Sequence, residues 1–216
     1  MKTAIVIGAT GLVGNHITKK LLDDARYHKV KVFVRRSLNY EHPKLEEHIV
    51  NFDEIETWKE KLTGDELYSA LGTTIKKAGS KENQYKIDFT YQYETAEVAS
   101  QNGVQKYLLV SSAGANSKSS NFYLRMKGTL DEKVEQLNFE MIRIFRPSIL
   151  AGERSEKRMA ESFGIKIAGI VTKFIPALKK YRPIDAEIVA AAMIKSANES
   201  QVEFFKIYQP EEIFEI

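Results

Sequence analysis

The sequence predicts an α/β protein built on a doubly wound, mostly parallel sheet. Short apolar runs alternate along the chain with amphipathic stretches of helical length, which is the pattern of repeated βαβ units. The first run, residues 3–7, is almost wholly apolar, as expected for a parallel strand that helices cover on both faces. Because parallel crossovers are nearly always right-handed, such units wind into one sheet with helices on both sides.

The individual elements follow from residue spacing and from stop signals. Val13, Ile17 and Leu21 recur at helical spacing just after the first run. Another predicted helix is stopped by Gly103, and the last predicted strand before Pro147 ends at that proline. We expect strands at residues 3–7, 30–34, 48–52, 65–71, 107–110, 140–145 and 203–208, and helices at 12–24, 85–101, 121–137 and 185–197.

Composition excludes several kinds of chemistry. The chain has 216 residues, no Cys and four dispersed His, which leaves no disulfide, no thiol nucleophile and no His-built metal site. A formal net charge of +3 is too small to indicate a nucleic-acid partner. No apolar stretch is long enough to span a membrane. We therefore expect a soluble, cytoplasmic protein with a single domain.

The charge is distributed unevenly. Residues 154–182 contain eight basic and two acidic side chains, so the remainder of the chain is net negative. Four explanations remain open: a lid over an anionic substrate, a partner-binding surface, a helix lying on a membrane surface, or the solvated face of a helix near the substrate.

The strongest motif lies between the first predicted strand and the first predicted helix. Glycine in such a turn permits a tight bend, close approach of backbone N–H groups to a pyrophosphate, and close packing of helix on strand. The helix N-terminus adds free N–H donors for the phosphates. The motif predicts a dinucleotide site, with an ordinary strand–helix turn as the alternative. Its expected cofactor-binding residues are Gly8, Thr10, Gly11, Leu12, Val13 and Gly14.

The end of the second predicted strand indicates which dinucleotide is bound. NAD-preferring sites usually place Asp or Glu about 20 residues beyond the glycine turn, to accept a hydrogen bond from the ribose 2′-OH. This chain has Arg35 and Arg36 there instead. A guanidinium group suits a 2′-phosphate because it has paired donors and a permanent positive charge. We expect NADP(H) to be preferred over NAD(H), with two solvated surface arginines as the alternative.

The motifs resemble those of the short-chain dehydrogenase/reductase superfamily. The Gly-x-x-Gly-x-x-Gly spacing is that of its extended and atypical branches, and other stretches resemble the bacterial relatives of the human Tat-interacting oxidoreductase. The resemblance implies a Rossmann-type coenzyme core in residues 1–150 and a substrate side in residues 151–216. The stretches that carry it, besides the glycine turn, are residues 70–74, 111–115, 119–128 and 145–147.

The superfamily's catalytic Tyr-x-x-x-Lys pattern occurs three times, but only Tyr123 and Lys127 lie inside a predicted amphipathic helix, one turn apart on one face. A phenol has a pKa near 10, and a nearby ammonium group favours its ionised form. The resemblance implies that Tyr123 exchanges a proton with the substrate oxygen, while Lys127 supports the phenol and holds the nicotinamide ribose. A serine hydroxyl would orient that oxygen, and Ser112 matches the family position better than Ser111.

Other cofactor positions are implied by the resemblance alone. Leu71, Gly72 and Thr73 end a predicted strand where the family's backbone passes the coenzyme. Asp53 stands where the family has an acid beside the adenine; a helix N-cap is the alternative. The stretch expected to meet the nicotinamide amide, or else to form a structural loop, is Pro147, Ser148 and Ile149.

These expectations lead to competing functions. The first is an NADP(H)-dependent oxidoreductase acting on a small carbonyl or alcohol through Ser112, Tyr123 and Lys127. The second is a regulatory or interaction protein that binds NADP(H) without turnover. The third, an epimerase or isomerase that keeps its NAD tightly bound, is disfavoured by Arg35 and Arg36. We also considered a homodimer, which no motif specifies.

Overall fold

A single parallel sheet organises the molecule. The computed structural model describes residues 1–151, 182–199 and 203–216, and in these ranges seven parallel strands pair in the order β3-β2-β1-β4-β5-β6-β9. The first strand, β1, lies in the middle of the sheet. The next two strands are added on one side of β1 and the later ones on its other side, so the strand order reverses between β1 and β4. In such sheets ligands bind at the carboxyl edge, at this reversal point. The strands are β1 (Lys2–Ile7), β2 (Tyr27–Val34), β3 (Leu45–Ile49), β4 (Glu66–Ser69), β5 (Lys106–Val110), β6 (Met141–Phe145) and β9 (Phe205–Tyr208).

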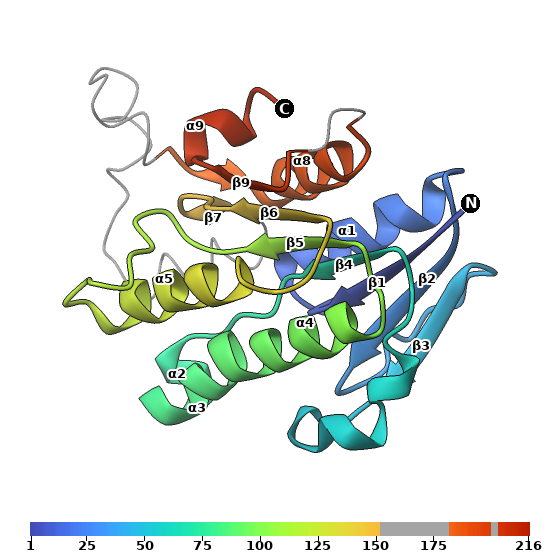
Figure 1. The fold of residues 1–216 in the computed structure, drawn as a ribbon, viewed down its shortest axis with the longest axis horizontal. Helices are drawn as coiled ribbons and strands as arrows, with labels where there is room; N and C mark the ends of the chain where they lie inside the picture. Colours follow the sequence, from blue (N-terminus) through green and yellow to red (C-terminus); the bar gives the residue numbers. More distant parts are fainter. Residues whose placement is uncertain (152–181, 200–202) are drawn as a thin grey trace.

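Helices cover both faces of this sheet, as Figure 1 shows. Helices α1 (Leu12–Asp23) and α8 (Ala186–Ala197) pack together on one face. On the other face, α4 (Tyr91–Gln101) packs against α5 (Phe122–Val134). The shorter elements are η1 (Phe52–Thr57), η2 (Lys59–Lys61), α2 (Ile75–Ala78), α3 (Lys81–Tyr85), the π-helical turn η3 (Lys86–Thr90), α9 (Pro210–Ile213), and the paired strands β7 (Leu150–Ala151) and β8 (Ile184–Asp185).

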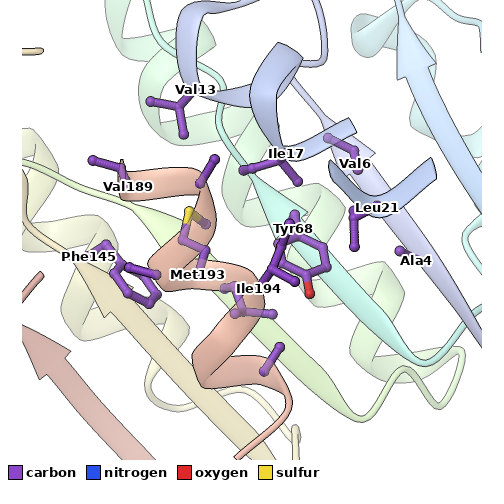
Figure 2. Close-up of a cluster of buried hydrophobic side chains, with 14 of the residues drawn as sticks. Ala4, Val6, Val13, Ile17, Leu21, Tyr68, Phe145, Val189, Met193 and Ile194 are labelled. Carbon is purple, nitrogen blue, oxygen red and sulfur yellow. The ribbon is translucent and has the colours of Figure 1, made fainter. Parts of the chain in front are cut away.

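The two faces of the sheet support separate apolar cores. Figure 2 shows the first, where Val13, Ile17 and Leu21 of α1 meet Val189 and Met193 of α8. Val13, Ile17 and Leu21 are the residues that recur at helical spacing in the sequence, so the amphipathic pattern predicted the buried face of α1 correctly. The second core lies under α4 and α5 and includes Ala96, Ala99, Leu130 and Val134. Truncating a buried leucine such as Leu130 to Ala costs about 2–5 kcal/mol of stability, so these contacts stabilise the packing of α4 and α5 on the sheet.

The predicted doubly wound parallel sheet is confirmed, and several of its elements begin or end at other residues than expected. The third strand lies at Leu45–Ile49 rather than 48–52, because it is a half-exposed edge strand in which Glu46 and Glu47 are tolerated. The helix expected over 85–101 begins at Lys81, where the Ser80 side chain accepts a hydrogen bond from the Asn83 N–H group at 3.1 Å.

Two further expectations concern the basic segment and membrane-spanning helices. Of the basic segment 154–182, only Arg182 lies inside them. Within the same ranges, no helix combines the length and apolar character that crossing a membrane requires.

Candidate functional site

The carboxyl ends of β1 and β4 enclose the glycine turn, and its glycines have no room for side chains. Gly8 has a φ of +83°, and a Cβ there would lie 2.4 Å from the Ala70 carbonyl oxygen of the neighbouring segment. A Cβ on Gly14 would lie 2.2 Å from the Gly8 carbonyl oxygen. Real Cβ atoms do not approach so closely, so both positions require glycine. The backbone of the turn is therefore drawn tightly onto the sheet edge, as a pyrophosphate cradle requires.

The turn leads directly into α1. Gly11 is the N-cap residue and offers no side-chain cap, so the first-turn N–H groups of α1 face the sheet edge as donors for an anion. Thr10 is exposed and Leu12 half-buried, whereas Val13 packs in the core.

Two arginines follow β2 beside this turn. Because Ile7 of β1 pairs with Phe33 of β2, the carboxyl end of β2 lies next to the glycine turn. Arg35 and Arg36 come immediately after it and are both exposed. Their position suits binding of a phosphate on the adenosine ribose, and their exposure also fits solvated surface residues.

Asp53 lies at the same edge, on η1. Its carboxylate accepts a hydrogen bond from the Tyr91 hydroxyl at 2.6 Å and forms an ion pair with Lys86 at 2.5 Å. The side chain of Asn51, not of Asp53, accepts the capping hydrogen bond at the start of η1. The alternative that Asp53 is the N-cap is therefore wrong.

Ser112, Tyr123 and Lys127 are brought together at the end of β5. Tyr123 and Lys127 lie one turn apart on α5, whose N-cap Asn121 accepts hydrogen bonds from the Tyr123 and Leu124 N–H groups. The Ser112 hydroxyl lies near the Tyr123 phenol and lowers its pKa. The Lys127 ammonium donates to the Val110 carbonyl oxygen at 3.1 Å.

Ser111 occupies a different environment. Its side chain is buried beside Asp131, whose pKa it lowers. Of the two serines, Ser112 is the one next to the phenol, which agrees with the preference from the sequence.

Tight packing fixes helix α5 against the loop that carries Ser112. A Cβ on Gly128 would lie 2.3 Å from the backbone of Asn116 and Ser117. The Asn116 N–H group also donates to the Leu124 carbonyl oxygen at 3.0 Å. Helix and loop therefore touch backbone to backbone beside Lys127.

The electrostatics of this group differ from the expectation. Burial, with the negative charge of Asp88 as the next cause, raises the pKa of Tyr123 to about 12. Burial lowers the pKa of Lys127, which Asp88 and Asp131 oppose. We expected the ammonium to lower the pKa of the phenol, and in this structure burial and two carboxylates outweigh any such effect.

Two segments expected to contact the coenzyme flank this group. Leu71, Gly72 and Thr73 follow β4 at the same edge. After β6, the Pro147 carbonyl oxygen accepts from the Ala113 N–H group at 2.9 Å, which ties this segment to the serine loop. Ser148 donates to the Arg182 carbonyl oxygen, and Ile149 is exposed.

Two buried carboxylates at this site were not predicted from the sequence. Asp88, on the π-helical turn, is 2% exposed, and its Oδ2 accepts from the Thr73 N–H group at 2.9 Å. Asp131 lies one turn after Lys127 on α5 and pairs with Arg146 at 2.9 Å. Polar residues at Gln84, Asp88 and Gln92 recur every four positions, and that spacing was a readable signal for a buried polar face.

The fold and the glycine turn define a Rossmann-type NAD(P)-binding protein. The matching family model is described as NAD(P)H-binding and covers residues 8–159. The chain therefore belongs to this family and is an atypical short-chain dehydrogenase/reductase related to HTATIP2.

Individual relatives agree with this assignment. Protein fmp52, mitochondrial, of Aspergillus fumigatus is 37% identical over 203 residues, covering 91% of this chain and 87% of that protein. Protein HTATIP2 of Rattus norvegicus is 32% identical over 172 residues, covering 78% of this chain and 71% of its own. A short-chain dehydrogenase/reductase superfamily protein from Agrobacterium tumefaciens with bound NAD shares the fold. Its TM-score is 0.70 at 13% identity, covering 96% of this chain and 77% of that one.

These relatives correct one expectation. Curated proteins similar to this chain from several fungi are named mitochondrial. The cytoplasmic location that we expected from the sequence is contradicted by that finding.

Proposed function

We propose that this protein is an NADP(H)-dependent oxidoreductase that transfers a hydride to or from a small carbonyl or alcohol. The observation that carries the proposal is the meeting of three groups at the sheet edge that holds the glycine turn. These are the Ser112 hydroxyl, the Tyr123 phenol and the Lys127 ammonium. They would supply a hydrogen bond, a proton and a positive charge, respectively.

The residues around them fit a dinucleotide. The turn from Gly8 to Gly14 leaves backbone N–H groups at the edge, where a pyrophosphate would be held. Arg35 and Arg36 would pair with a ribose 2′-phosphate, which is the reason to prefer NADP(H). The segments 71–73 and 147–149 would line the rest of the coenzyme. When bound, the nicotinamide supplies or accepts the hydride.

The chain's own groups would handle the proton. With its pKa raised to about 12, Tyr123 is protonated at neutral pH and can donate its proton to a substrate carbonyl oxygen. Ser112 would donate a hydrogen bond to that oxygen, and Lys127 would stabilise the phenolate that remains. The carbonyl carbon gains the hydride and its oxygen gains the phenolic proton, so the product is an alcohol; solvent then reprotonates Tyr123.

A second candidate function is coenzyme binding without turnover, as a regulatory or interaction protein. One observation favours it: Asp88 and Asp131 both raise the pKa of Tyr123, which makes the phenolate harder to form. Both functions use the same coenzyme site, so they differ only in whether a substrate is reduced.

A substrate screen separates the two functions. The wild-type protein is incubated with NADPH and a panel of aldehydes, ketones and quinones, and loss of absorbance at the nicotinamide band is followed. We expect Tyr123→Phe to lower turnover at least about 100-fold while NADPH binding persists. Tyr93→Phe, which removes a hydroxyl that donates to Glu97 on α4, is the matched control and should behave as wild type.

The outcomes have distinct meanings. Unchanged turnover in Tyr123→Phe contradicts the assigned role of the phenol. NADPH binding by the wild type without oxidation by any carbonyl supports the binding function instead. Absence of NADPH binding by the folded wild type overturns both.

A further inference from the structure

A lysine-rich segment, residues 74–86, directly follows the 71–73 loop that is assigned to the coenzyme. It contains four lysines and one acidic residue, Glu82, although the whole chain has a net charge of only +3. The segment forms α2, α3 and the start of η3. Figure 1 shows α2 and α3 at the same edge of the sheet as the start of α5, so positive charge is concentrated beside the candidate site.

One of these lysines, Lys81, lies at the outer end of the helix that faces the candidate site. Lys81 is seven residues, or two helical turns, before Asp88, so both lie on one face of α3 and η3. Asp88 acts on Tyr123 and Lys127 from this face. Since the helix runs away from the carboxyl edge of the sheet, Lys81 lies farther out than Asp88, by about 10 Å along the axis.

A contact with α5 confirms where Lys81 lies. Its ammonium group lies 5.7 Å from the centre of the Phe122 ring, and Phe122 directly precedes Tyr123 on α5. The lysine side chain is exposed and the phenylalanine is half-buried. The two side chains therefore present a positive charge next to an apolar surface, just outside the phenol.

This charge is separated from the end of the site that would hold the phosphates. The glycine turn follows β1, and Arg35 and Arg36 follow β2, whereas Ser112 follows β5. In the strand order β2-β1-β4-β5 the end of β5 is two strands from the end of β1, which is about 10 Å. Lys81 and Phe122 thus lie on the side where a substrate would meet the three polar groups, not where a pyrophosphate would be held.

We propose that Lys81 selects substrates that carry a carboxylate: its ammonium group pairs with the acid of a carbonyl compound whose carbonyl oxygen meets Ser112 and Tyr123. The Phe122 ring contacts the apolar chain between the two ends. Because Lys81 lies well outside the phenol, the carboxylate is several bonds away from the carbonyl carbon. This inference rests on the proposed function and names the substrate class for that site.

Three variants isolate the charge of Lys81. Lys81→Gln removes the positive charge and keeps a side chain that can lie over Phe122. Lys81→Arg keeps the charge and should restore the preference for an acid. Lys19→Gln is the matched control, because it removes an equally exposed lysine from α1, on the other face of the sheet. Thermal unfolding checks that each variant is folded.

The first measurement compares NADPH oxidation by two aldehydes of one chain length, azelaic semialdehyde, which ends in a carboxylate, and its methyl ester. We expect the wild type to have a kcat/KM at least about fivefold higher for the acid. Lys81→Gln should lower this ratio at least about threefold, through KM, while Lys81→Arg and Lys19→Gln keep it. Added salt should lower the wild-type ratio, because it screens an exposed pair.

Equal kcat/KM values for the acid and the ester in the wild type overturn the inference and leave the proposed function intact. Absence of NADPH oxidation with every carbonyl overturns the proposed function instead. A measurement without turnover then still decides the role of Lys81: calorimetric titration with nonanoate, an unreactive acid of the same chain length, with and without NADP⁺. We expect Lys81→Gln to bind nonanoate at least about threefold more weakly than wild type. Equal affinities, or no binding to the wild type, overturn the inference.

Discussion

Arg146 holds the buried carboxylate of Asp131 through two nitrogen atoms, Nε at 3.0 Å and Nη2 at 2.9 Å from the same oxygen, Oδ2. The other oxygen, Oδ1, has no hydrogen-bond partner among the described residues. Burial raises the pKa of Asp131, while Ser111, Arg146 and Lys127 lower it. The ion pair therefore provides a counter-charge for a carboxylate that is buried behind the candidate site.

Arg146→Met should destabilise the protein, because it leaves a buried carboxylate without its main counter-charge. We expect the free energy of unfolding to fall by about 3 kcal/mol at pH 8. The loss should shrink on acidification, because protonating Asp131 removes the uncompensated charge. Denaturant unfolding at several pH values measures this. Arg26→Met breaks the exposed pair with Asp24 and should cost less than about 1 kcal/mol; equal costs would contradict the interpretation.

Replacing Asp88 by Asn should change how stability depends on pH. Burial raises the pKa of Asp88 to about 6, against 3.8 for the exposed group, so ionising it in the folded state costs stability. That cost is absent below pH 4, grows between pH 4 and 6, and is complete above pH 6. Asp88→Asn should therefore be more stable than wild type by about 1–3 kcal/mol at pH 7.5. A difference that does not vary with pH would refute the assigned titration.

A methyl group on the glycine turn should disrupt it. Gly14→Ala places a Cβ against the Gly8 carbonyl, where the backbone cannot yield, so we expect a loss of about 1–3 kcal/mol. NADPH should then no longer raise the melting temperature. Gly72→Ala is the control for stability, because its Cβ would lie 3.6 Å from an Asp88 oxygen, an ordinary contact. If Gly14→Ala is as stable as Gly72→Ala, the turn is looser than the structure indicates.

The two arginines after β2 should determine the coenzyme preference. We expect NADPH to raise the melting temperature of the wild type more than NADH does at equal concentration. Changing both Arg35 and Arg36 to Ala should weaken NADPH binding at least about tenfold and leave NADH binding nearly unaffected. Lys19→Ala, which removes an exposed cation from α1, is the matched control. Equal shifts with both coenzymes in the wild type would contradict the preference.

The sheet was predictable because several of its buried strands are apolar runs, of which β1 ends directly before Gly8 and β6 just before Pro147. The glycine turn was predictable because steric exclusion at Gly8 and Gly14 requires a particular residue type at fixed spacing. Strand β3 was misplaced because an edge strand bears polar residues such as Glu46 and so lacks the apolar signal.

The ionisable surroundings of Tyr123 were not predictable in the same way. The pKa of the phenol depends on Asp88, which is 35 positions earlier in the chain and comes close to α5 because η3 packs against that helix. Local spacing identified Tyr123 and Lys127 but contains no information about charges contributed by another helix. That is why the net shift of the phenol pKa is upward, opposite to the lowering that we expected from Lys127 alone.

The close approach at Gly128 has a consequence for how this architecture can vary. Main chain rather than side chain sets the separation between the serine loop and helix α5 at this point, so that separation does not depend on which side chains the two segments carry nearby. Substitutions elsewhere at this edge of the sheet should leave that separation unchanged, whereas a side chain at position 128 would force the helix and the loop apart.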